Sequence, residues 1–251
     1  MPTLRALIFD VDGTLADTER DGHRVAFNRA FADAGLPWNW SVEQYGTLLD
    51  VTGGKERIQH YVKTYEPTFA VPGGDLKQFA AALHAGKTEH YKQLLKDAVI
   101  PLRPGVKRLL LTAREQGLRL AIATTTTPAN VTALLQSSLS PESLSWFEVI
   151  AAGDIVPLKK PAPDIFDYAL EKLDLAPEEC FAFEDSGQGL KSALGAGLRT
   201  VITLNEYTRL HDFTGASFVL SDLGEPDAPF EAIAGDVGNA TYFDLGLIQG
   251  N

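Results

Sequence analysis

Hydrophobic and polar positions alternate along the chain with two different periods. Short apolar runs rich in β-branched and aromatic residues are typical of buried strands. Such runs cover residues 4–9, 118–123, 147–151, 180–183 and 199–203. Segments with apolar residues at helical spacing stand between or after them, at residues 105–116, 129–136, 164–173 and 187–196. This alternation predicts an α/β fold, a doubly wound parallel sheet with helices on both faces.

The region between the first two expected strands breaks this pattern. It contains helix-like segments at residues 20–34, 41–48, 55–64 and 75–95, and no convincing strand. We therefore expect an α/β core domain made of residues 1–16 and 98–251, with an inserted α-helical domain at residues 17–97. The connections near residues 16–18 and 96–101 would act as hinges. After residue 204, one more strand is expected at residues 217–220, followed by a tail that the pattern does not place.

Composition and charge narrow the class of protein. The 251 residues are enough to bury a sizeable core. A net charge of -11 disfavours nucleic acid and anionic membranes as partners, so an anionic substrate would need local cations. No apolar stretch has the length of a membrane span, and no signal peptide is evident. The single cysteine, Cys180, excludes an internal disulfide. We expect a soluble, cytoplasmic protein, and a monomer because no coiled coil is evident.

The most informative motif is Asp10-Val11-Asp12-Gly13-Thr14, which directly follows the apolar run of residues 7–9. A strand end holds Asp10 rigidly, and Gly13 allows the chain to curl so that Asp12 faces the atom that Asp10 attacks. Two aspartates in this arrangement predict a phosphoryl-transfer site. A strand followed by an ordinary Asx turn would need only one of them.

A second motif, Thr124-Thr125-Thr126-Thr127-Pro128, follows the next strand of the expected core. In an open parallel sheet, motifs that follow strands converge on one edge. A hydroxyl there, beside the amides of a helix N-terminus, makes a phosphate cradle, so Thr124 and Thr125 are candidate phosphate ligands. Thr126 or Thr127 would serve equally well as a simple helix cap, with Pro128 in the first turn.

Two further motifs supply a cation and acids. Lys160 lies in a proline-rich loop that can aim it at a phosphoryl group, whereas Lys159 is expected to face solvent. Glu184 and Asp185 follow a buried strand, and either could simply cap the next helix. Next to Asp10, they would form the hard oxygen site that Mg²⁺ prefers. The candidate metal ligands are Asp10, Asp12, Glu184 and Asp185.

These four motifs, in this order, closely resemble those of the haloacid dehalogenase-like (HAD) phosphatase superfamily, whose core is a Rossmann-like sheet. The resemblance implies that Asp10 is a nucleophile that forms an aspartyl-phosphate. It implies that Asp12 protonates the leaving group and then deprotonates water. An aspartate has an unperturbed pKa of about 3.9, so that role needs burial or neighbouring anions that raise it. The helical insertion looks like the mobile cap with which this superfamily chooses substrates.

Segments 53–58, 85–91 and 159–164 are similar to the CbbY group of this superfamily. Members of that group are xylulose-1,5-bisphosphate phosphatases, which remove sugar bisphosphates that inhibit Rubisco. A bisphosphate needs cations for its second phosphate, and Lys55 and Lys87 lie on expected helices of the insertion. Each of them could equally be a solvated surface lysine. The candidate substrate-binding residues of the insertion are Glu19, Arg20, His23, Gly54, Lys55, Arg57 and Lys87.

His23 is a special case among these candidates. Members of the group carry this histidine one residue earlier, so a packed or solvated histidine is an alternative to a ligand-binding one. The other histidines have no metal-ligand spacing, which disfavours zinc. Trp38 and Trp40 are expected to pack inside the insertion rather than to stack on a sugar.

The sequence thus predicts a Mg²⁺-dependent phosphatase with a small sugar phosphate as substrate, and the resemblance to the CbbY group implies that this substrate is xylulose-1,5-bisphosphate. A sugar phosphomutase of the β-phosphoglucomutase type is the alternative, because it would use the same aspartates and a similar cap. A non-catalytic binding module is disfavoured because all four motifs are intact. Dehalogenase chemistry is disfavoured because those relatives lack the acid that Asp12 supplies.

Overall fold

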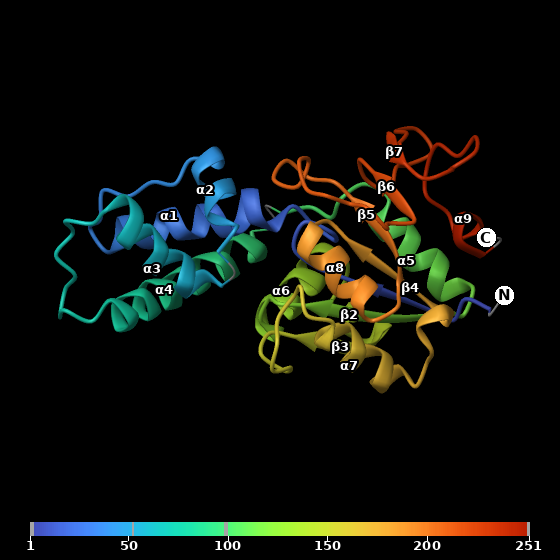
Figure 1. The fold of residues 1–251 in the computed structure, drawn as a ribbon, viewed down its shortest axis with the longest axis horizontal. Helices are drawn as coiled ribbons and strands as arrows, with labels where there is room; N and C mark the ends of the chain where they lie inside the picture. The colour runs from blue at the N-terminus through green and yellow to red at the C-terminus, as the bar shows by residue number, and fades with distance from the viewer. Residues whose placement is uncertain (1–2, 52, 98–99, 250–251) are drawn as a thin grey trace. The chain divides into compact units, whose positions relative to one another are not determined.

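The computed structural model describes residues 3–51, 53–97 and 100–249, which form two compact units (Figure 1). One unit, here called the core unit, comprises Met1–Asp17 and Pro101–Asn251, and the other, the helical unit, comprises Thr18–Ile100. Residues 98 and 99, in the second expected hinge and at the expected domain boundary, lie outside the described part. The expected domain bounds and the mobility of the insertion stay predictions.

The core unit is built on one mixed, mainly parallel sheet (Figure 1). Its strands are β1 (Ala6–Phe9), β2 (Arg119–Thr124), β3 (Phe147–Ala152), β4 (Cys180–Glu184), β5 (Arg199–Thr203), β6 (Phe218–Leu220) and β7 (Ala232–Ala234). They lie in the order β3-β2-β1-β4-β5-β6-β7, and all neighbours are parallel except β6 and β7. The expected α/β fold with a parallel sheet is confirmed. The strand expected at residues 217–220 is present as β6.

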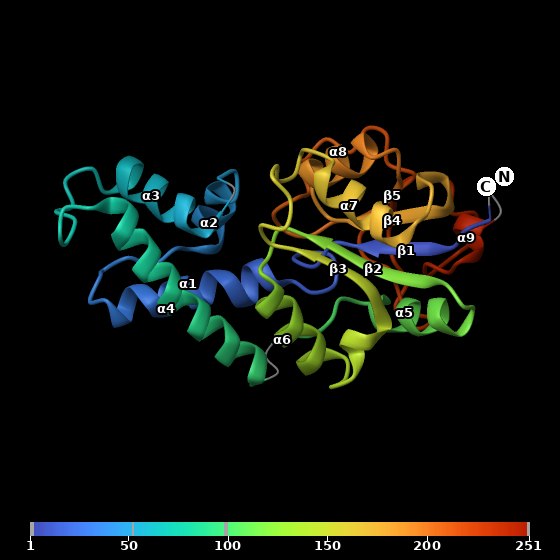
Figure 2. The ribbon, with the colours of Figure 1, turned by 90° about the horizontal axis from the view of Figure 1, so that it is seen from below.

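Helices cover both faces of this sheet, as Figure 2 shows, with α5 and α6 on one face and α7 and α8 on the other. The helical segments of the core unit are α5 (Val106–Glu115), α6 (Pro128–Ser138), η2 (Ser143–Trp146), α7 (Asp164–Leu173), η3 (Pro177–Glu179), α8 (Gly187–Gly195) and α9 (Gly246–Gln249). Under α7 and α8 the strands present small residues such as Ala6, Ala121 and Ala182, which let Ile165 and Phe166 pack closely on the sheet.

The tail that the hydrophobic pattern did not place is packed onto the core unit. The fully buried ring of Phe243 contacts the rings of Phe183, at 5.5 Å, and Phe218, at 6.1 Å, between centroids. The Arg108 guanidinium donates hydrogen bonds to the carbonyl oxygens of Leu223, Gly224 and Phe243 and pairs with the Glu225 carboxylate. The Arg108 contacts join residues more than a hundred positions apart, which a local pattern cannot reveal.

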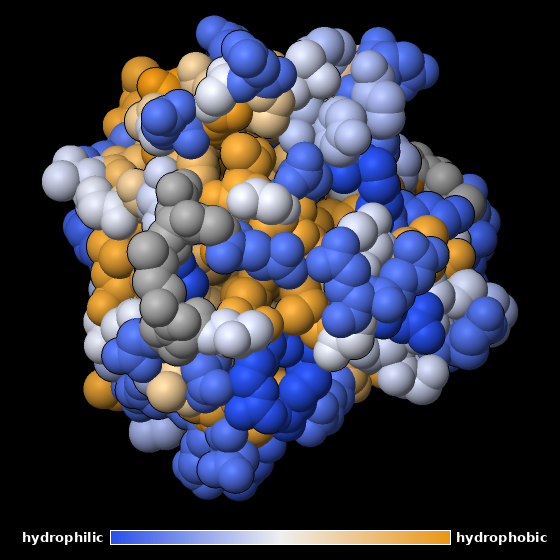
Figure 3. Space-filling view, turned by 90° about the vertical axis from the view of Figure 1, so that its right-hand side faces the viewer, coloured by the Kyte–Doolittle hydropathy of each residue, from blue (hydrophilic) through white to orange (hydrophobic). Residues whose placement is uncertain are grey.

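The end of the core unit where the strands begin is shown in Figure 3, with hydrophobic residues exposed between polar ones. Phe181, Arg199 and Phe218, at or near the starts of β4, β5 and β6, line a cavity of about 310 Å³ together with Ser217, Asp236 and Leu247. This cavity is therefore at the opposite end of the strands from the sequence motifs, which follow the strands.

The helical unit contains η1 (Glu19–His23), α1 (Arg24–Asp33), α2 (Val42–Leu48), α3 (Gly54–Tyr65) and α4 (Leu76–Lys96) (Figures 1 and 2). Helix α4 packs against both α1 and α3. The core of the helical unit is aromatic: Trp40 is fully buried against Phe27 and Phe31, and Trp38 is 4 % exposed. The expected packing role of both tryptophans is confirmed. None of the helices in the described part of the chain has the length and hydrophobicity needed to cross a bilayer.

The first turn of the helical unit, η1, is a π-helix that continues directly into α1. A π-turn closes hydrogen bonds from residue i to i+5 and so holds one residue more than an α-turn. The additional residue that the resemblance implies before His23 would fit in this wide turn, which continues into α1 without a break. The side chain of His23 is 5 % exposed, so the alternative of a solvated histidine is excluded.

Candidate active site

The sequence motifs of the core unit meet at the carboxyl end of the sheet. Phe9 is in register with Ile122 of β2 on one side and Phe183 of β4 on the other. Asp10, the next residue, is therefore beside the ends of both neighbouring strands, where Thr124 and Glu184 are the last residues. The register of β1 with β2 and β4 thus brings these motifs to one edge of the sheet, as expected.

The Lys160 ammonium ties these strand ends together. It is 8 % exposed, and its Nζ atom donates to Oδ1 of Asp10 at 2.5 Å and to Oε1 of Glu184 at 2.5 Å. Its third hydrogen bond is to the carbonyl oxygen of Ala123, at 2.9 Å. All three donors of the ammonium are used. Lys159, in contrast, pairs with Asp154, whose side chain is 88 % exposed, in agreement with its expected position in solvent.

Three buried carboxylates surround this contact. One oxygen atom each from Asp10, Glu184 and Asp185 lie within 4.8 Å of one another, whereas the Asp12 side chain is not part of this described group. Ser186, rather than either acid, caps α8 by accepting a hydrogen bond from the Gly189 amide. The simple capping role considered for the two acids is therefore excluded.

The charge balance of this group favours a bound cation. Burial, opposed by the Lys160 ammonium and reinforced by Glu184, raises the pKa of the Asp10 carboxyl to about 8. Burial, with Asp10 and Glu184 nearby, also raises the pKa of Asp185 well above its ordinary value. One ammonium does not neutralise three carboxylates. Oxygen ligands of this kind suit a divalent metal ion, which would keep the carboxylates ionised.

Asn205, which the sequence analysis missed, holds one of these acids. Its Nδ2 atom donates to Oδ2 of Asp185 at 2.6 Å, and its Oδ1 atom accepts from the Tyr207 amide at 2.9 Å. The approach is close enough that Gly13, at φ +83°, has no room for a Cβ beside Asp185 and Asn205. Asn205 follows β5 with no neighbouring polar motif, so no local signal marked it.

The threonine motif is arranged as a cradle at the start of α6. Thr124 is 1 % exposed, and its Oγ1 atom accepts a hydrogen bond from the Thr126 amide at 3.3 Å. Thr127 caps the helix by accepting from the Asn130 amide, with Pro128 in the first turn, as expected. Thr125 is half-buried between them. That Thr124 and Thr125 bind phosphate stays a prediction.

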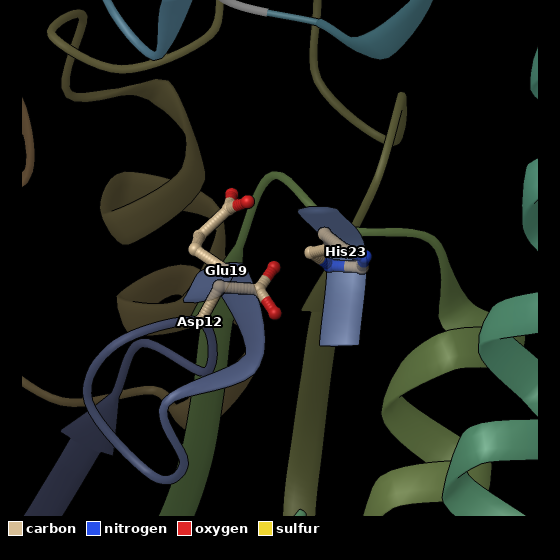
Figure 4. A group of neighbouring side chains, drawn as sticks. All are labelled: Asp12, Glu19 and His23. Carbon is tan, nitrogen blue, oxygen red and sulfur yellow. The ribbon is translucent and has the colours of Figure 1, made fainter. Parts of the chain in front are cut away.

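The loop after β1 carries Asp12, which Figure 4 shows together with Glu19 and His23 of η1. The buried Arg103 guanidinium donates to the carbonyl oxygen of Gly13 at 2.5 Å. It also donates to the carbonyl oxygens of Leu204 and Ser221. Arg103 thereby connects the loops that follow three strands. The sequence analysis missed it because a lone arginine after a connecting segment carries no pattern.

Within the helical unit, the candidate substrate residues fall into a buried and an exposed set. Arg57 and Lys87 are 7 % and 5 % exposed, whereas Lys55 and Arg20 are exposed. Arg20 forms two hydrogen bonds of 2.8 Å with Asp21. The ligand-binding roles expected for these residues stay predictions.

Gly54 and His84 meet in the same unit. A Cβ at Gly54 would collide with the imidazole of His84 and crowd the ring of Phe27, so the glycine makes close helix packing possible. Burial, together with the nearby cations Lys87 and Lys55, lowers the pKa of His84 to about 4. His84 is therefore neutral at neutral pH. The sequence analysis examined it only as a metal ligand and missed its place among the cations.

The fold agrees with comparisons to known proteins. A family model for haloacid dehalogenase-like hydrolases matches residues 4–197. The chain belongs to the haloacid dehalogenase-like hydrolase family and is a phosphatase of that family.

Its relatives within the family include CbbY proteins. The plasmid CbbY protein of Cupriavidus necator is 48% identical over 226 residues, which are 90% of this chain and 88% of that protein. CbbY of Rhodobacter capsulatus is 51% identical over 220 residues, or 88% of this chain and 94% of that protein. A crystal structure of a CbbY mutant from Rhodobacter sphaeroides in complex with xylulose-1,5-bisphosphate has a TM-score of 0.79 and 44% identity, covering 87% of this chain and 94% of that one. The resemblance to the CbbY group is confirmed.

Proposed function

We propose that this protein is a Mg²⁺-dependent phosphatase that hydrolyses a sugar bisphosphate, with xylulose-1,5-bisphosphate as its substrate. The observation that carries the proposal is the contact of the Lys160 ammonium with Asp10 and Glu184, next to the third buried carboxylate, Asp185. The choice of substrate is supported by the CbbY relatives and by the sugar bisphosphate bound in the Rhodobacter sphaeroides structure.

The first step transfers the phosphoryl group to Asp10. One carboxylate oxygen of Asp10 forms a bond to phosphorus as the ester P–O bond breaks. The leaving sugar oxygen takes a proton from the Asp12 carboxyl, which acts as general acid. Lys160 stabilises negative charge on the transferring group, and the hydroxyls and amides of Thr124 and Thr125 bind its oxygens.

The second step releases phosphate. The Asp12 carboxylate, now deprotonated, takes a proton from water as the water oxygen attacks phosphorus. The bond between phosphorus and the Asp10 oxygen breaks, which restores the carboxylate and frees inorganic phosphate. Asp12 is suited to both tasks because it lies on a tight turn, in which the Gly13 amide donates to the Ala16 carbonyl at 2.8 Å.

Asp10, Glu184 and Asp185 would hold the Mg²⁺ ion, with Asp12 as a further ligand expected from the sequence. Bound there, the ion would neutralise charge on the phosphoryl oxygens and keep Asp10 ionised. Asn205 would orient Asp185 as a ligand, since residues that hydrogen-bond to metal ligands fix their position.

The helical unit would bind the remainder of the substrate. Among the predicted residues, exposed Lys55 is the best candidate for the second phosphate, because its ammonium is accessible and lies at the start of α3. Glu19, Arg20 and His23 would contact the sugar, and Gly54, Arg57 and Lys87 would support that surface.

A panel of sugar monophosphates and bisphosphates, assayed for released phosphate with Mg²⁺ and with EDTA, tests the proposal. We expect release only with the divalent ion, and the highest kcat/KM for xylulose-1,5-bisphosphate. Product analysis separates the phosphomutase alternative. An isomeric sugar phosphate without accumulating inorganic phosphate would contradict the hydrolase proposal. The expected monomer is tested in parallel by analytical ultracentrifugation.

A further inference from the structure

One buried arginine of the core unit contacts several of the loops around the candidate active site. The Nη1 atom of Arg103 donates to the carbonyl oxygen of Gly13 at 2.5 Å and lies 3.2 Å from Oδ1 of Asp17. Its Nη2 atom donates to the carbonyl oxygens of Leu204 and, at 2.8 Å, Ser221. A planar guanidinium spreads its donors over three nitrogen atoms, whereas a lysine ammonium concentrates them on one. The set of contacts therefore requires arginine.

The first of these contacts fixes the turn that carries Asp12, which Figure 4 shows on the loop after β1. The amide of Gly13, the next residue, donates to the carbonyl oxygen of Ala16 at 2.8 Å. With Arg103 on its carbonyl oxygen, Gly13 is held at both of its backbone polar groups. The amide of Arg103 also donates to the carbonyl oxygen of Leu15, at 2.9 Å, in the same turn. A general acid must stay within hydrogen-bond reach of the leaving oxygen, and a fixed turn favours that.

A second contact fixes the loop that carries Asn205. The carbonyl oxygen of Leu204 accepts from Arg103, and the amide of Asn205 donates to Oγ1 of Thr208 at 3.0 Å. The peptide group between Leu204 and Asn205 is thus held at its oxygen and at its nitrogen. The side chain of Asn205 donates to the Asp185 carboxylate at 2.6 Å. Arg103 therefore acts on a candidate metal ligand through one intermediate residue.

We infer that Arg103 is a positioning residue that aligns two parts of the active site with each other. It orients the general acid Asp12 through the turn at Gly13, and the metal ligand Asp185 through Asn205. The inference deepens the proposed function and rests on it. The two carboxylates follow different strands, β1 and β4, and one guanidinium connects the loops on which their positions depend.

Arg108 offers a matched control in the same unit. Its guanidinium also donates to three backbone carbonyl oxygens and pairs with a carboxylate, but these groups belong to the tail, at residues 223–225 and Phe243. Lysine in place of either arginine keeps the positive charge and loses the spread of donors. If Arg103 served stability alone, Arg103→Lys and Arg108→Lys would have effects of the same kind.

The effect on Asp12 is tested through the leaving group, at saturating Mg²⁺. The sugar oxygen of xylulose-1,5-bisphosphate needs a proton as it leaves, whereas the phenolate of p-nitrophenyl phosphate leaves without one. General acid catalysis contributes about 10²- to 10⁴-fold. We therefore expect Arg103→Lys to lower kcat/KM for the sugar bisphosphate about 10-fold more than for the aryl phosphate. Arg108→Lys should affect both substrates equally.

The same loss on both substrates in Arg103→Lys, or the same difference between substrates in Arg108→Lys, would overturn the inference alone. Circular dichroism establishes that each variant folds. If Arg103→Lys does not fold, Asp17→Asn replaces it, because this change removes only the half-buried carboxylate that pairs with Nη1. It should show the same difference between substrates at smaller size, and its absence would count against Arg103.

The link to Asp185 is tested without turnover. Titration calorimetry measures the affinity for Mg²⁺ of wild type, Arg103→Lys and Arg108→Lys. Loss of support for a metal ligand weakens metal binding about 10- to 100-fold, so we expect about 10-fold weaker binding in Arg103→Lys and wild-type affinity in Arg108→Lys. Unchanged affinity in Arg103→Lys would refute the link through Asn205. A wild-type protein that binds Mg²⁺ but releases phosphate from no sugar phosphate would instead overturn the proposed function, and the role of Arg103 in positioning a general acid with it.

Discussion

Replacing Lys160 by methionine tests how much of the site's stability depends on one ammonium. The side chains of Lys160, Asp10 and Glu184 are 8%, 9% and 1% exposed, and both ion-pair distances are 2.5 Å. Removing one partner from a buried ion pair costs about 3–5 kcal/mol, because the remaining charges stay buried without compensation. The Lys160 ammonium also lies 5.1 Å from the centre of the Phe166 ring, and methionine places an unbranched apolar chain there, so lost packing adds little.

The cost of Lys160→Met should depend on pH in a defined direction. In the metal-free fold the pKa of Asp10 is about 8, above its ordinary value of 3.8. At pH values between 3.8 and 8, the folded state therefore binds a proton that the unfolded chain has lost. Stability of the wild type therefore falls as pH rises towards 8 and then levels off. Without the ammonium the folded-state pKa of Asp10 rises further. The deficit of the variant should grow above pH 8 by up to about 1.4 kcal/mol per pH unit.

Urea unfolding in EDTA, followed by circular dichroism at pH 6 and pH 9, measures both effects. Lys159→Met is the matched control, because its ion pair with Asp154 is exposed and is worth about 0–1 kcal/mol. A Lys160→Met variant as stable as Lys159→Met at pH 9 would show that the ammonium does not offset the carboxylates. A deficit that is larger at pH 6 than at pH 9 would contradict the proposed titration of Asp10.

Four shorter predictions concern the remaining residues. Asp10→Asn should abolish phosphate release with unchanged circular dichroism, and residual turnover would remove Asp10 from the role of nucleophile. Asn205→Ala should weaken Mg²⁺ binding about 10- to 100-fold in calorimetry, and wild-type affinity would argue against its support of a metal ligand. Lys55→Ala should raise KM for a bisphosphate far more than for a monophosphate, with exposed Lys63→Ala as control, and equal losses would refute a second phosphate site there. Burial raises the pKa of the Cys180 thiol to about 12, so thiol reagents at pH 8 should label it only in urea, and rapid labelling of the folded protein would contradict its burial.

The parts of the fold that could be predicted are those encoded locally. The ranges of α7 and β5 coincide with the expected segments, because the helical stripe of α7 lies between Pro163 and Asp174 and the apolar run of β5 follows the charged Arg199. The strand β7 and the helix α9 were not predicted. Strand β7 is exposed at all three positions, and α9 has only four residues, so neither carries a hydrophobic period. Long-range contacts of Arg108 and Phe243 hold this region instead.

In the candidate site, too, the residues with a local sequence signal were predicted and those held only by long-range contacts were not. Asp10, Thr124, Lys160 and Glu184 each follow or face a strand end, so a parallel sheet was sufficient to bring them together. Residues that act through others were missed. Each of these residues, Asn205, Arg103 and Tyr45, forms a hydrogen bond with a residue distant in sequence. A single amide, guanidinium or hydroxyl has no spacing that a sequence pattern could show.

Buried cations are used differently in the two units, and this difference changes how the sequence should be interpreted. In an acidic chain, every lysine or arginine near a candidate site is a candidate phosphate ligand. In the core unit, Lys160 is buried among carboxylates that outnumber it, which leaves a need for a further cation. In the helical unit, hydrogen bonds of Arg57 and Lys87 go to Tyr45 and to His23. Exposed Lys55 is therefore a cation of the helical unit on which recognition of a second phosphate should depend.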